Sequence, residues 1–219
     1  MFDTNIFNLG ILFFIYLLPI FLIYVGIIKY RYRLFVLSLI AIVTILIIIL
    51  ENWSLSTLGI RFDNLISFLG PYIFFTIGIS ILLIFISKKV MKKQHVIKWW
   101  TNKRITITFI PVSVVQEFLF RGFLIPVLYE MLGSIFLVVI INSAIFMFMH
   151  IIYSHTVADL LFVFLEGILL ATMYVLFPNL ILITLAHAAH NFLAVYFNYF
   201  NSDRVGFVEA PSITEPPKV

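Results

Sequence analysis

Long apolar runs dominate this sequence and decide what it can fold into. Seven of them are long enough, or nearly so, to cross about 30 Å of hydrocarbon, a distance that takes about 20 helical residues. They lie at Ile6–Ile28, Leu34–Leu50, Leu65–Ile86, Ile105–Leu128, Ser134–Ile152, Leu160–Phe177 and Leu180–Phe200, and the second and sixth are short. Because an open sheet would leave backbone amides unpaired in lipid, each run is predicted to be a helix. The predicted fold class is all-α, a polytopic transmembrane helical bundle with about seven (7–8) spans.

Composition agrees with a lipid solvent. Hydrophobic residues make up 63% of the 219 residues and charged residues 11%, whereas a soluble domain averages about 45–50% and about 25%. The chain contains no cysteine, which excludes disulfides, thiolate metal sites and a cysteine nucleophile. The net charge of +4 forms no stripe on a soluble face. The lipid bilayer is therefore the expected partner, and nucleic acid is not.

Basic residues predict the orientation of the bundle in a cell membrane. Most of the 14 Lys and Arg residues lie in the segments 29–33 and 88–104, which hold no acidic residue and are separated by two spans. The positive-inside rule makes that side cytoplasmic. A multi-pass protein with seven spans then has its N-terminus outside and its C-terminus in the cytoplasm. The first run lacks a basic n-region and is interpreted as a retained span, not a signal peptide.

Three segments organise the chain. Residues 1–104 hold the first three spans and the basic cytoplasmic loop, residues 105–200 hold four spans that contain polar groups, and residues 201–219 form a flexible cytoplasmic tail. His155 and Asp159 lie in the short connection between the fifth and sixth spans and are expected to be solvated.

Polar side chains in the fourth run are the first candidates for a functional site. An ionisable group at membrane depth costs roughly 2.5–3.5 kcal/mol on insertion scales, so a functional role is the default hypothesis. Glu117 and Arg121 are four residues apart and share a helix face, which predicts an ion pair within the helix, most simply a structural clasp. Gln116 lies about 100° around the helix from Glu117 and does not share that pair.

Later runs carry a second set of polar side chains. His150 ends the fifth run and Glu166 lies in the sixth, where packing or a buried hydrogen bond would explain it. In the seventh run, His187 and Asn191 share a face, and His190 points somewhat away from both. Each has a structural explanation when taken alone, such as hydrogen bonding between helices. Polar groups on several helices together favour a functional site.

Three kinds of chemistry fit such a set. It could activate water by general base catalysis and hold an oxyanion, which hydrolyses an amide. It could bind a divalent metal such as zinc and activate water that way. It could also relay protons or ions in a transporter, although the sequence shows no inverted repeat of the kind typical of transporters. The motifs H-E-x-x-H, G-x-G-D and G-x-S-x-G are absent, which leaves a Glu/His arrangement for a hydrolase.

Three motifs on successive predicted helices resemble one known family. The sequence reads Gln116-Glu117-x-x-x-Arg121, Phe146-x-x-x-His150 and His187-x-x-x-Asn191. In order and spacing these resemble the E-E-x-x-x-R, F-x-x-x-H and H-x-x-x-N motifs of the CAAX protease and bacteriocin-processing (CPBP, or Abi) family of intramembrane proteases. The resemblance covers roughly residues 105–200, which would then form the catalytic core.

The resemblance implies a membrane peptidase that processes small peptides or proteins close to the bilayer. In the family, the first glutamate of the pair activates water, the second-motif histidine assists it, and the third-motif histidine and asparagine support the water and the oxyanion. These roles carry over to Gln116, His150, His187 and Asn191, with Glu117 and Arg121 as the ion pair. No metal or other cofactor is expected, because a neutral amide and a tethered carboxylate leave few ligands; zinc is the alternative. Association into a homo-oligomer is left open.

Gln116 is the departure from the family pattern that matters most. A neutral amide does not accept a proton from water at pH 7, and loss of a general base typically forfeits about 10²–10⁴ in rate. The chain as written is therefore predicted to be catalytically impaired. Either Gln116 is natural, in a pseudoprotease that acts as a membrane binding, immunity or regulatory protein, or it replaces a native glutamate. A third interpretation makes Glu117 the base, which requires breaking its pair with Arg121.

Overall fold

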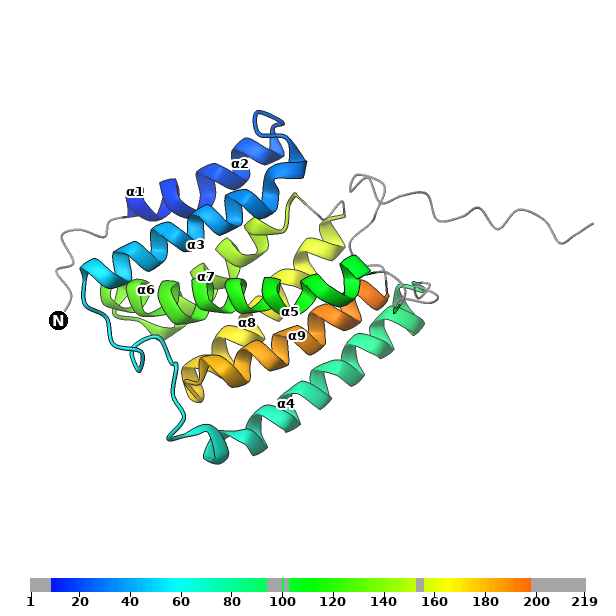
Figure 1. Cartoon of the computed structure of the whole chain (residues 1–219). Helices are drawn as coiled ribbons and strands as arrows, with labels where there is room; N and C mark the ends of the chain where they lie inside the picture. Colours follow the sequence, from blue (N-terminus) through cyan, green and yellow to red (C-terminus); the bar gives the residue numbers. More distant parts are fainter. Residues whose placement is uncertain (1–8, 94–99, 101–102, 153–155, 198–219) are drawn as a thin grey trace, which may run out of the picture.

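Helices account for all the regular structure in the part of the chain that is described. The computed structural model describes residues 9–93, 100, 103–152 and 156–197 (Figure 1), and over these residues it contains no strand, which confirms the all-α class. The elements in order are α1 (Leu9–Leu12), a π-helical segment (Phe13–Leu17), α2 (Leu18–Tyr24), a 3₁₀ turn (Tyr30–Tyr32), α3 (Arg33–Leu50), α4 (Leu65–Phe85), a π-helical segment (Ile86–Val90), α5 (Lys103–Glu117), a π-helical segment (Phe118–Leu124), α6 (Ile125–Leu132), α7 (Ile135–Met149), α8 (Val157–Leu176) and α9 (Leu180–Tyr196).

The apolar helices fall where the sequence predicts spans. Within the described residues, four helices are long and apolar enough to cross a membrane, namely Tyr30–Leu50, Leu65–Val90, Phe109–Leu132 and Val157–Leu176. Three apolar helices in the same part of the chain are shorter, namely Gly10–Tyr24, Ile135–Met149 and Leu180–Tyr196. The prediction that the second and sixth spans are the short ones is wrong. The turn at Tyr30–Tyr32 lengthens the second, and Thr156 caps the sixth at an earlier residue than predicted.

The connection before α8 corrects one prediction. Asp159 is not solvated: it is 9% exposed, and Lys93 Nζ lies 3.1 Å from its Oδ1. The Thr156 hydroxyl donates to the Asp159 carboxylate at 2.6 Å and accepts from the Asp159 backbone N–H at 3.0 Å. This capping arrangement starts α8 and keeps the carboxylate close to the backbone. Some predicted features lie outside the described residues. These are His155, residues 94–99 and 101–102 of the basic segment, the N-terminal end of the first predicted span, the C-terminal end of the last one, and the predicted tail 201–219.

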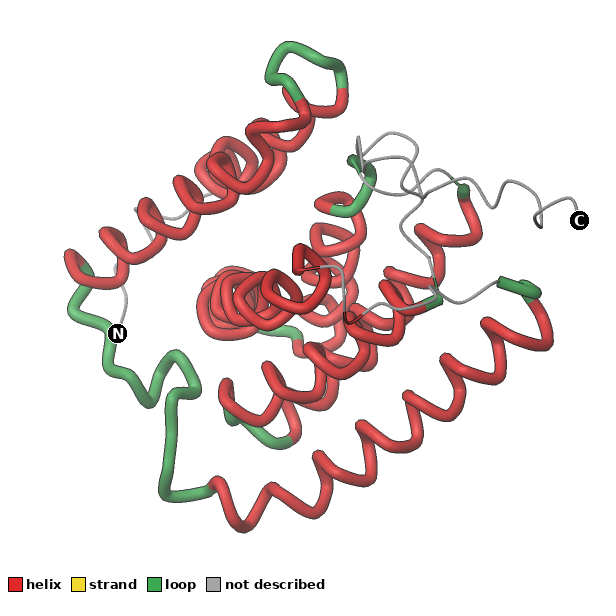
Figure 2. The backbone as a smooth tube through the Cα atoms, turned by 45° about the vertical axis from the view of Figure 1, so that its right-hand side comes forward, coloured by secondary structure: helices red, strands yellow, loops and turns green. Residues whose placement is uncertain are grey.

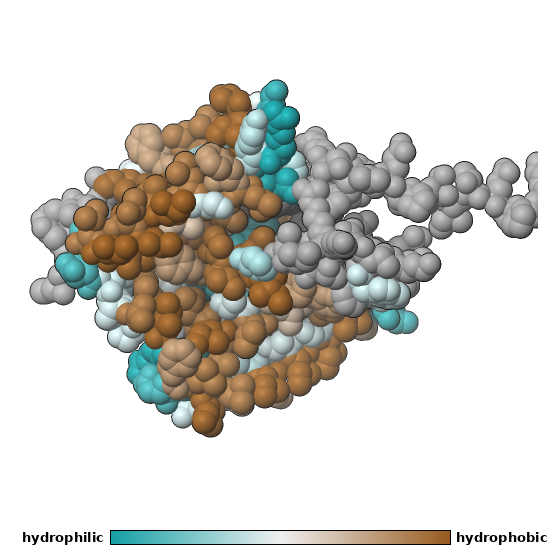
Figure 3. Space-filling view, viewed as in Figure 1, coloured by the Kyte–Doolittle hydropathy of each residue, from teal (hydrophilic) through white to brown (hydrophobic). Residues whose placement is uncertain are grey.

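The outward faces of the helices are apolar. On α4, Ile66 and Phe74 are 84% and 83% exposed, and Figure 3 shows hydrophobic side chains over much of the visible face, with hydrophilic residues in smaller patches. Soluble monomers rarely expose contiguous apolar surface of this extent. The surface therefore fits a protein embedded in a membrane.

Helix α9 holds a central position among the later helices. It packs against both α4 and α5, and Figure 2 shows the long α4 running along the edge of the molecule. Helices α7 and α8 approach each other closely at Gly167, where a Cβ atom would lie 3.1 Å from Ser143 Cβ and 3.3 Å from the Phe146 ring. Small residues permit such close contact between membrane helices. Polar residues on α5, α7, α8 and α9 can therefore meet in the interior.

The loop between α3 and α4 fixes where α9 begins. The Asn179 side chain caps the first turn of α9, and its Nδ2 donates to Arg61 O at 2.9 Å and to Asn64 Oδ1 at 2.7 Å. The Leu180 backbone N–H also donates to Gly59 O at 2.7 Å. The loop thus satisfies groups that a helix end would otherwise leave unpaired, and it anchors the helix that carries the third motif.

The helix that carries the first motif changes geometry directly after the motif begins. Helix α5 ends at Glu117 and passes into the π-helical segment Phe118–Leu124, which continues into α6. Pro126 stands in the first turn of α6 and has no N–H to continue the regular α-helical bonding. Single-turn π segments within α-helices frequently occur at functional sites.

Side chains from two other helices bind carbonyl oxygens of this π segment. Tyr16, in the π segment Phe13–Leu17, donates its hydroxyl to Leu119 O at 3.0 Å. Asn142 of α7 donates through Nδ2 to Phe120 O at 2.8 Å. Side-chain donors inserted into the helical ladder in this way help a membrane helix keep an irregular turn.

Candidate active site

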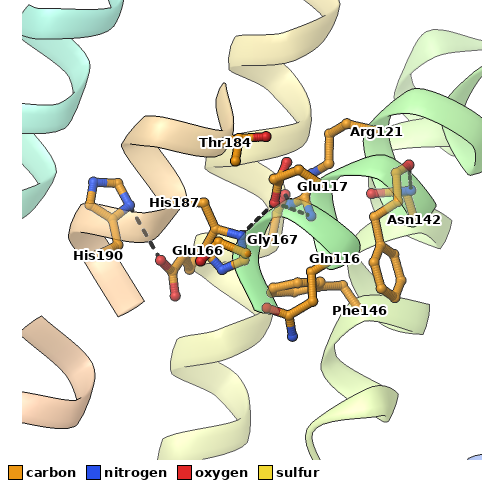
Figure 4. A network of polar contacts seen from close by, with 12 residues as sticks. Gln116, Glu117, Arg121, Asn142, Phe146, Glu166, Gly167, Thr184, His187 and His190 are labelled. Atoms are coloured by element: carbon orange, nitrogen blue, oxygen red, sulfur yellow. Dashed lines mark hydrogen bonds and ion pairs between the residues drawn. The ribbon is translucent and has the colours of Figure 1, made fainter. Parts of the chain in front are cut away.

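The residues predicted for the site come together inside the bundle, on three helical stretches. Gln116, Glu117 and Arg121 lie on α5 and the π segment, His150 follows α7 directly, and His187 and Asn191 lie on α9. All are buried except Asn191, which is partly buried. Figure 4 shows Glu117, Arg121 and His187 turned toward one another, with Gln116 on another side of the same helix.

Glu117 is bound on two sides. Its carboxylate is fully buried, and Arg121 Nη1 donates to Oε1 at 3.1 Å, so the ion pair predicted within the helix is present. His187 Nδ1 lies 2.6 Å from the same oxygen, a contact that the sequence did not predict. A guanidinium and an imidazole thus share one carboxylate oxygen, which ties α9 to α5. Its other oxygen, Oε2, is buried and has no hydrogen-bond partner among the described residues. Glu117 is a poor candidate for the water-activating base, because protonation would remove the charge that attracts Arg121.

Arg121 is enclosed by groups from three helices. It is fully buried, and besides Glu117 its Nη2 donates to Gly167 O of α8 at 3.4 Å. The guanidinium carbon lies 4.6 Å from the centre of the Phe146 ring, within the range of a cation–π interaction. A bidentate, planar cation suits such a position better than a lysine would. The clasp predicted from sequence therefore extends beyond its own helix.

Gln116 belongs to a separate group of contacts. It is 8% exposed, and Asn191 Nδ2 lies 3.5 Å from its Oε1. The same Nδ2 donates to Ser113 Oγ at 2.9 Å, and the Ser113 hydroxyl donates to Phe109 O at 2.7 Å. The amide of Asn191 is thereby oriented toward α5, with Gln116 and Ser113 one turn apart on the receiving face.

His150 is held by the phenylalanine of its own motif. The ring Nδ1 and Phe146 O are 2.8 Å apart. A carbonyl can only accept, so Nδ1 carries the proton in this contact and Nε2 carries the lone pair of the neutral ring. The Phe146 ring centre lies 4.7 Å from that of His150 and 5.6 Å from that of His187. One aromatic ring therefore contacts both histidines and also faces Arg121.

A further acid–imidazole pair lies beside the predicted site. Glu166 of α8 is partly buried, and its Oε1 lies 3.3 Å from Nδ1 of His190. The prediction that His190 points away from His187 and Asn191 agrees with this contact. The His190 ring is 1% exposed and lies 5.7 Å, centre to centre, from the Phe75 ring of α4. Helices α4, α8 and α9 therefore meet at this pair.

Sequence reasoning missed three contributors. Ser113 precedes Gln116 by three residues, so its position on the same face was available from helical spacing. Phe146 entered the sequence analysis only as a letter of the second motif, although its ring contacts His150, His187 and Arg121. Asn142 lies one turn before Phe146 and donates to a carbonyl of the π segment. No sequence pattern predicts that segment, so there was no reason in the sequence to expect a side-chain donor to it.

The structure offers little for a metal ion. Among the described residues, no group of three or more histidine, aspartate or glutamate side chains is placed to hold one. The acidic side chains of the site each already contact a histidine. That catalysis needs no metal or other cofactor stays a prediction.

Comparison with known families bears on the same residues. Residues 98–193 match the family model described as type II CAAX prenyl endopeptidase Rce1-like. The matched segment contains all three motifs and confirms the resemblance to the CPBP family of intramembrane proteases. Comparisons with curated proteins and with solved structures gave no match.

The family match and the structure agree on the class of protein. The matched segment spans the helices that hold the buried polar site, and the apolar outer faces suit a bilayer. Together they suggest a membrane-embedded protease. Within that class, the family match supports the CAAX type of intramembrane endopeptidase.

Proposed function

We propose that this chain is an intramembrane endopeptidase of the glutamate/histidine type whose hydrolytic step is impaired by Gln116. Its substrates are small peptides or proteins with a cleavage site close to the membrane. The observation that carries the proposal is the division of the site. Arg121 and His187 both contact Oε1 of the Glu117 carboxylate, whereas a neutral amide, Gln116, lies beside Asn191.

Each remaining side chain has a role in this proposal. His150, placed by the contact of its Nδ1 with Phe146 O, assists the attacking water in the role that the family resemblance gives it. An oxyanion forms when water attacks a peptide carbonyl, and two groups are placed to donate to it. His187, held through Nδ1 by Glu117, donates from Nε2 when its ring is protonated. Asn191, held by Ser113, donates with its second amide N–H, which has to leave the long 3.5 Å contact with Gln116 Oε1. The missing part is a carboxylate at residue 116 to take the proton of the attacking water.

The test is to supply that carboxylate. Gln116→Glu is expected to raise the cleavage rate of membrane-proximal peptides by about 10²–10⁴, the usual contribution of a general base. Purified protein in bilayer discs would be assayed with CAAX peptides, prenylated and unmodified in parallel, which also identifies the substrate class. A metal chelator should leave the rate unchanged. Gln116→Met, which keeps the length without the polar group, is the matched control and should stay inert.

A folded Gln116→Glu protein that cleaves neither peptide would remove the main support for an enzyme. The second candidate is then a natural pseudoprotease that binds a partner as an immunity or regulatory protein. The observation in its favour is that Gln116 makes its contacts as a neutral amide with the rest of the site intact. For such a protein, Gln116→Glu would leave the phenotype unchanged, and His187→Ala would abolish partner binding.

We further propose that the protein lies in the cell membrane with its N-terminus outside and its C-terminus in the cytoplasm. The basic segments 29–33 and 88–104 support this orientation. Because the chain has no cysteine, single cysteines introduced near residues 31 and 62 would report the side directly. Only the second is expected to react with a membrane-impermeant thiol reagent applied from outside, and the reverse pattern would invert the topology.

A further inference from the structure

The Glu166–His190 pair is a buried polar group that the proposed mechanism does not use. His190 is 1% exposed, and its Nδ1 faces the Glu166 carboxylate at 3.3 Å. Neither ring nitrogen has a hydrogen bond of good geometry among the residues that the structure describes, and Nε2, which is also buried, has no ion-pair contact there either. Buried polar atoms are nearly always paired, so an exception in a native fold calls for an explanation.

The surroundings of His190 suggest what its partner is. His190 follows His187 by three residues on α9, so it lies one turn further along the same helix. On its other side is Phe75 of α4. Helix α4 is the least enclosed of the four long apolar helices, with 11% of its most apolar stretch buried against 61% for Phe109–Leu132. The unpaired nitrogen therefore lies between the proposed reaction centre and the helix that faces lipid most openly.

A peptide substrate needs polar partners in this region. The segment to be cut must be extended, and its backbone N–H and C=O groups then lose their intrahelical bonds in a medium without water. The protein has to supply replacements next to the reaction centre. An imidazole nitrogen can do so in either form, since it accepts from N–H when neutral and donates to C=O when protonated.

We propose that Glu166 and His190 form a substrate-binding subsite that bonds to a backbone amide of the extended peptide beside the scissile bond. The inference rests on the proposed function, because it presumes that a peptide occupies the site. Glu166 faces Nδ1 of the ring (Figure 4), which leaves Nε2 for the peptide. Helix α4 has to shift at Phe75 to admit it.

Peptide binding to the unaltered protein tests the inference without any cleavage. The Gln116 form should hold a fluorescent prenylated CAAX peptide uncut, and its Kd can be read by polarisation in bilayer discs. Replacing the pair with apolar residues of similar size, Glu166→Met with His190→Phe, is expected to weaken binding about 3- to 10-fold, the equivalent of one hydrogen bond. The thermal midpoint should stay level or rise, because such replacement of a buried pair is often neutral or stabilising.

A purely structural pair predicts the opposite result: a lower thermal midpoint with Kd within twofold of the parent, which would overturn the inference. Thr44→Val is the matched control, since Thr44 is fully buried on α3, donates to Ile40 O at 2.9 Å and bonds with Tyr16, away from Glu166 and His190; its Kd should not change. If the double variant does not fold, His190→Gln, which keeps a hydrogen-bonding group, should bind at least threefold more tightly than His190→Leu. Equal binding of those two would refute the subsite.

Failure of the proposed function has a different signature. Cleavage by the Gln116→Glu protein decides the proposed function, whatever the pair does. If that protein cleaves, and the double replacement leaves its KM unchanged, the subsite is wrong and the enzyme stands. If the unaltered protein binds no peptide at all, the subsite is likewise refuted, and cleavage by Gln116→Glu still decides the enzyme.

Discussion

Removing Arg121 alone should be far more damaging than removing it together with its partner. In Arg121→Met, the fully buried Glu117 carboxylate loses the guanidinium 3.1 Å away. Two unit charges at that separation attract by about 5 kcal/mol at an effective dielectric of ~20. Measured losses on breaking a buried pair are about 3–5 kcal/mol, since the remaining charge stays desolvated. We expect a loss of that size in the free energy of unfolding.

The double variant Glu117→Gln/Arg121→Met separates this account from a mere packing defect. It removes both charges, so most of the loss should be recovered and the coupling in a double-mutant cycle should be about 2 kcal/mol or more. Unfolding would be followed by denaturant titration in mixed micelles. Arg61→Met is the control, because the Arg61–Asp63 pair is solvent-exposed and such pairs contribute about 0–1 kcal/mol. If Arg121→Met costs no more than Arg61→Met, the buried clasp is not a stabilising pair.

Two further substitutions test other parts of the structure. Ser113→Ala in the Gln116→Glu protein removes the hydroxyl that accepts from Asn191 Nδ2 at 2.9 Å and orients that side chain. The kcat for cleavage should fall about tenfold with little change in KM, and Ser113→Thr should restore it. An effect on KM alone would contradict the orienting role. Gly59→Ala should lower the free energy of unfolding by roughly 1–3 kcal/mol. The reason is that Gly59 has a φ of +72° and that a Cβ there would collide with the Tyr174 hydroxyl. An unchanged thermal midpoint would show that the loop accommodates the Cβ and that this strain does not limit stability.

Periodicity and composition predicted what depends on the solvent. In lipid, a helix satisfies all the backbone hydrogen bonds of an apolar run within the run itself, so hydropathy predicted the class of fold. The Glu117–Arg121 pair followed from four-residue spacing, which acts within one helix. Both inferences needed only local geometry, and the structure agrees with each.

Contacts between helices were out of reach for a single sequence. Nothing in the chain says that His187 of α9 reaches Glu117 and not Gln116, because helical spacing fixes a face but not its neighbour. The pairing of Lys93 with Asp159 was missed for the same reason. Span lengths were misjudged where capping, not hydropathy, sets the end of a helix. The partner of each buried polar group is decided by packing.

The hydrogen bond between Tyr16 and Leu119 bears on how small a working unit can be. Tyr16 lies far outside the matched residues 98–193, yet its hydroxyl binds a carbonyl two residues after Glu117. A fragment cut to the matched segment would expose that carbonyl to hydrocarbon, where nothing replaces the lost donor. The first helices, which carry no motif of their own, therefore supply a donor to the helix that carries the first motif. We expect a fragment without them to be less stable than the full chain.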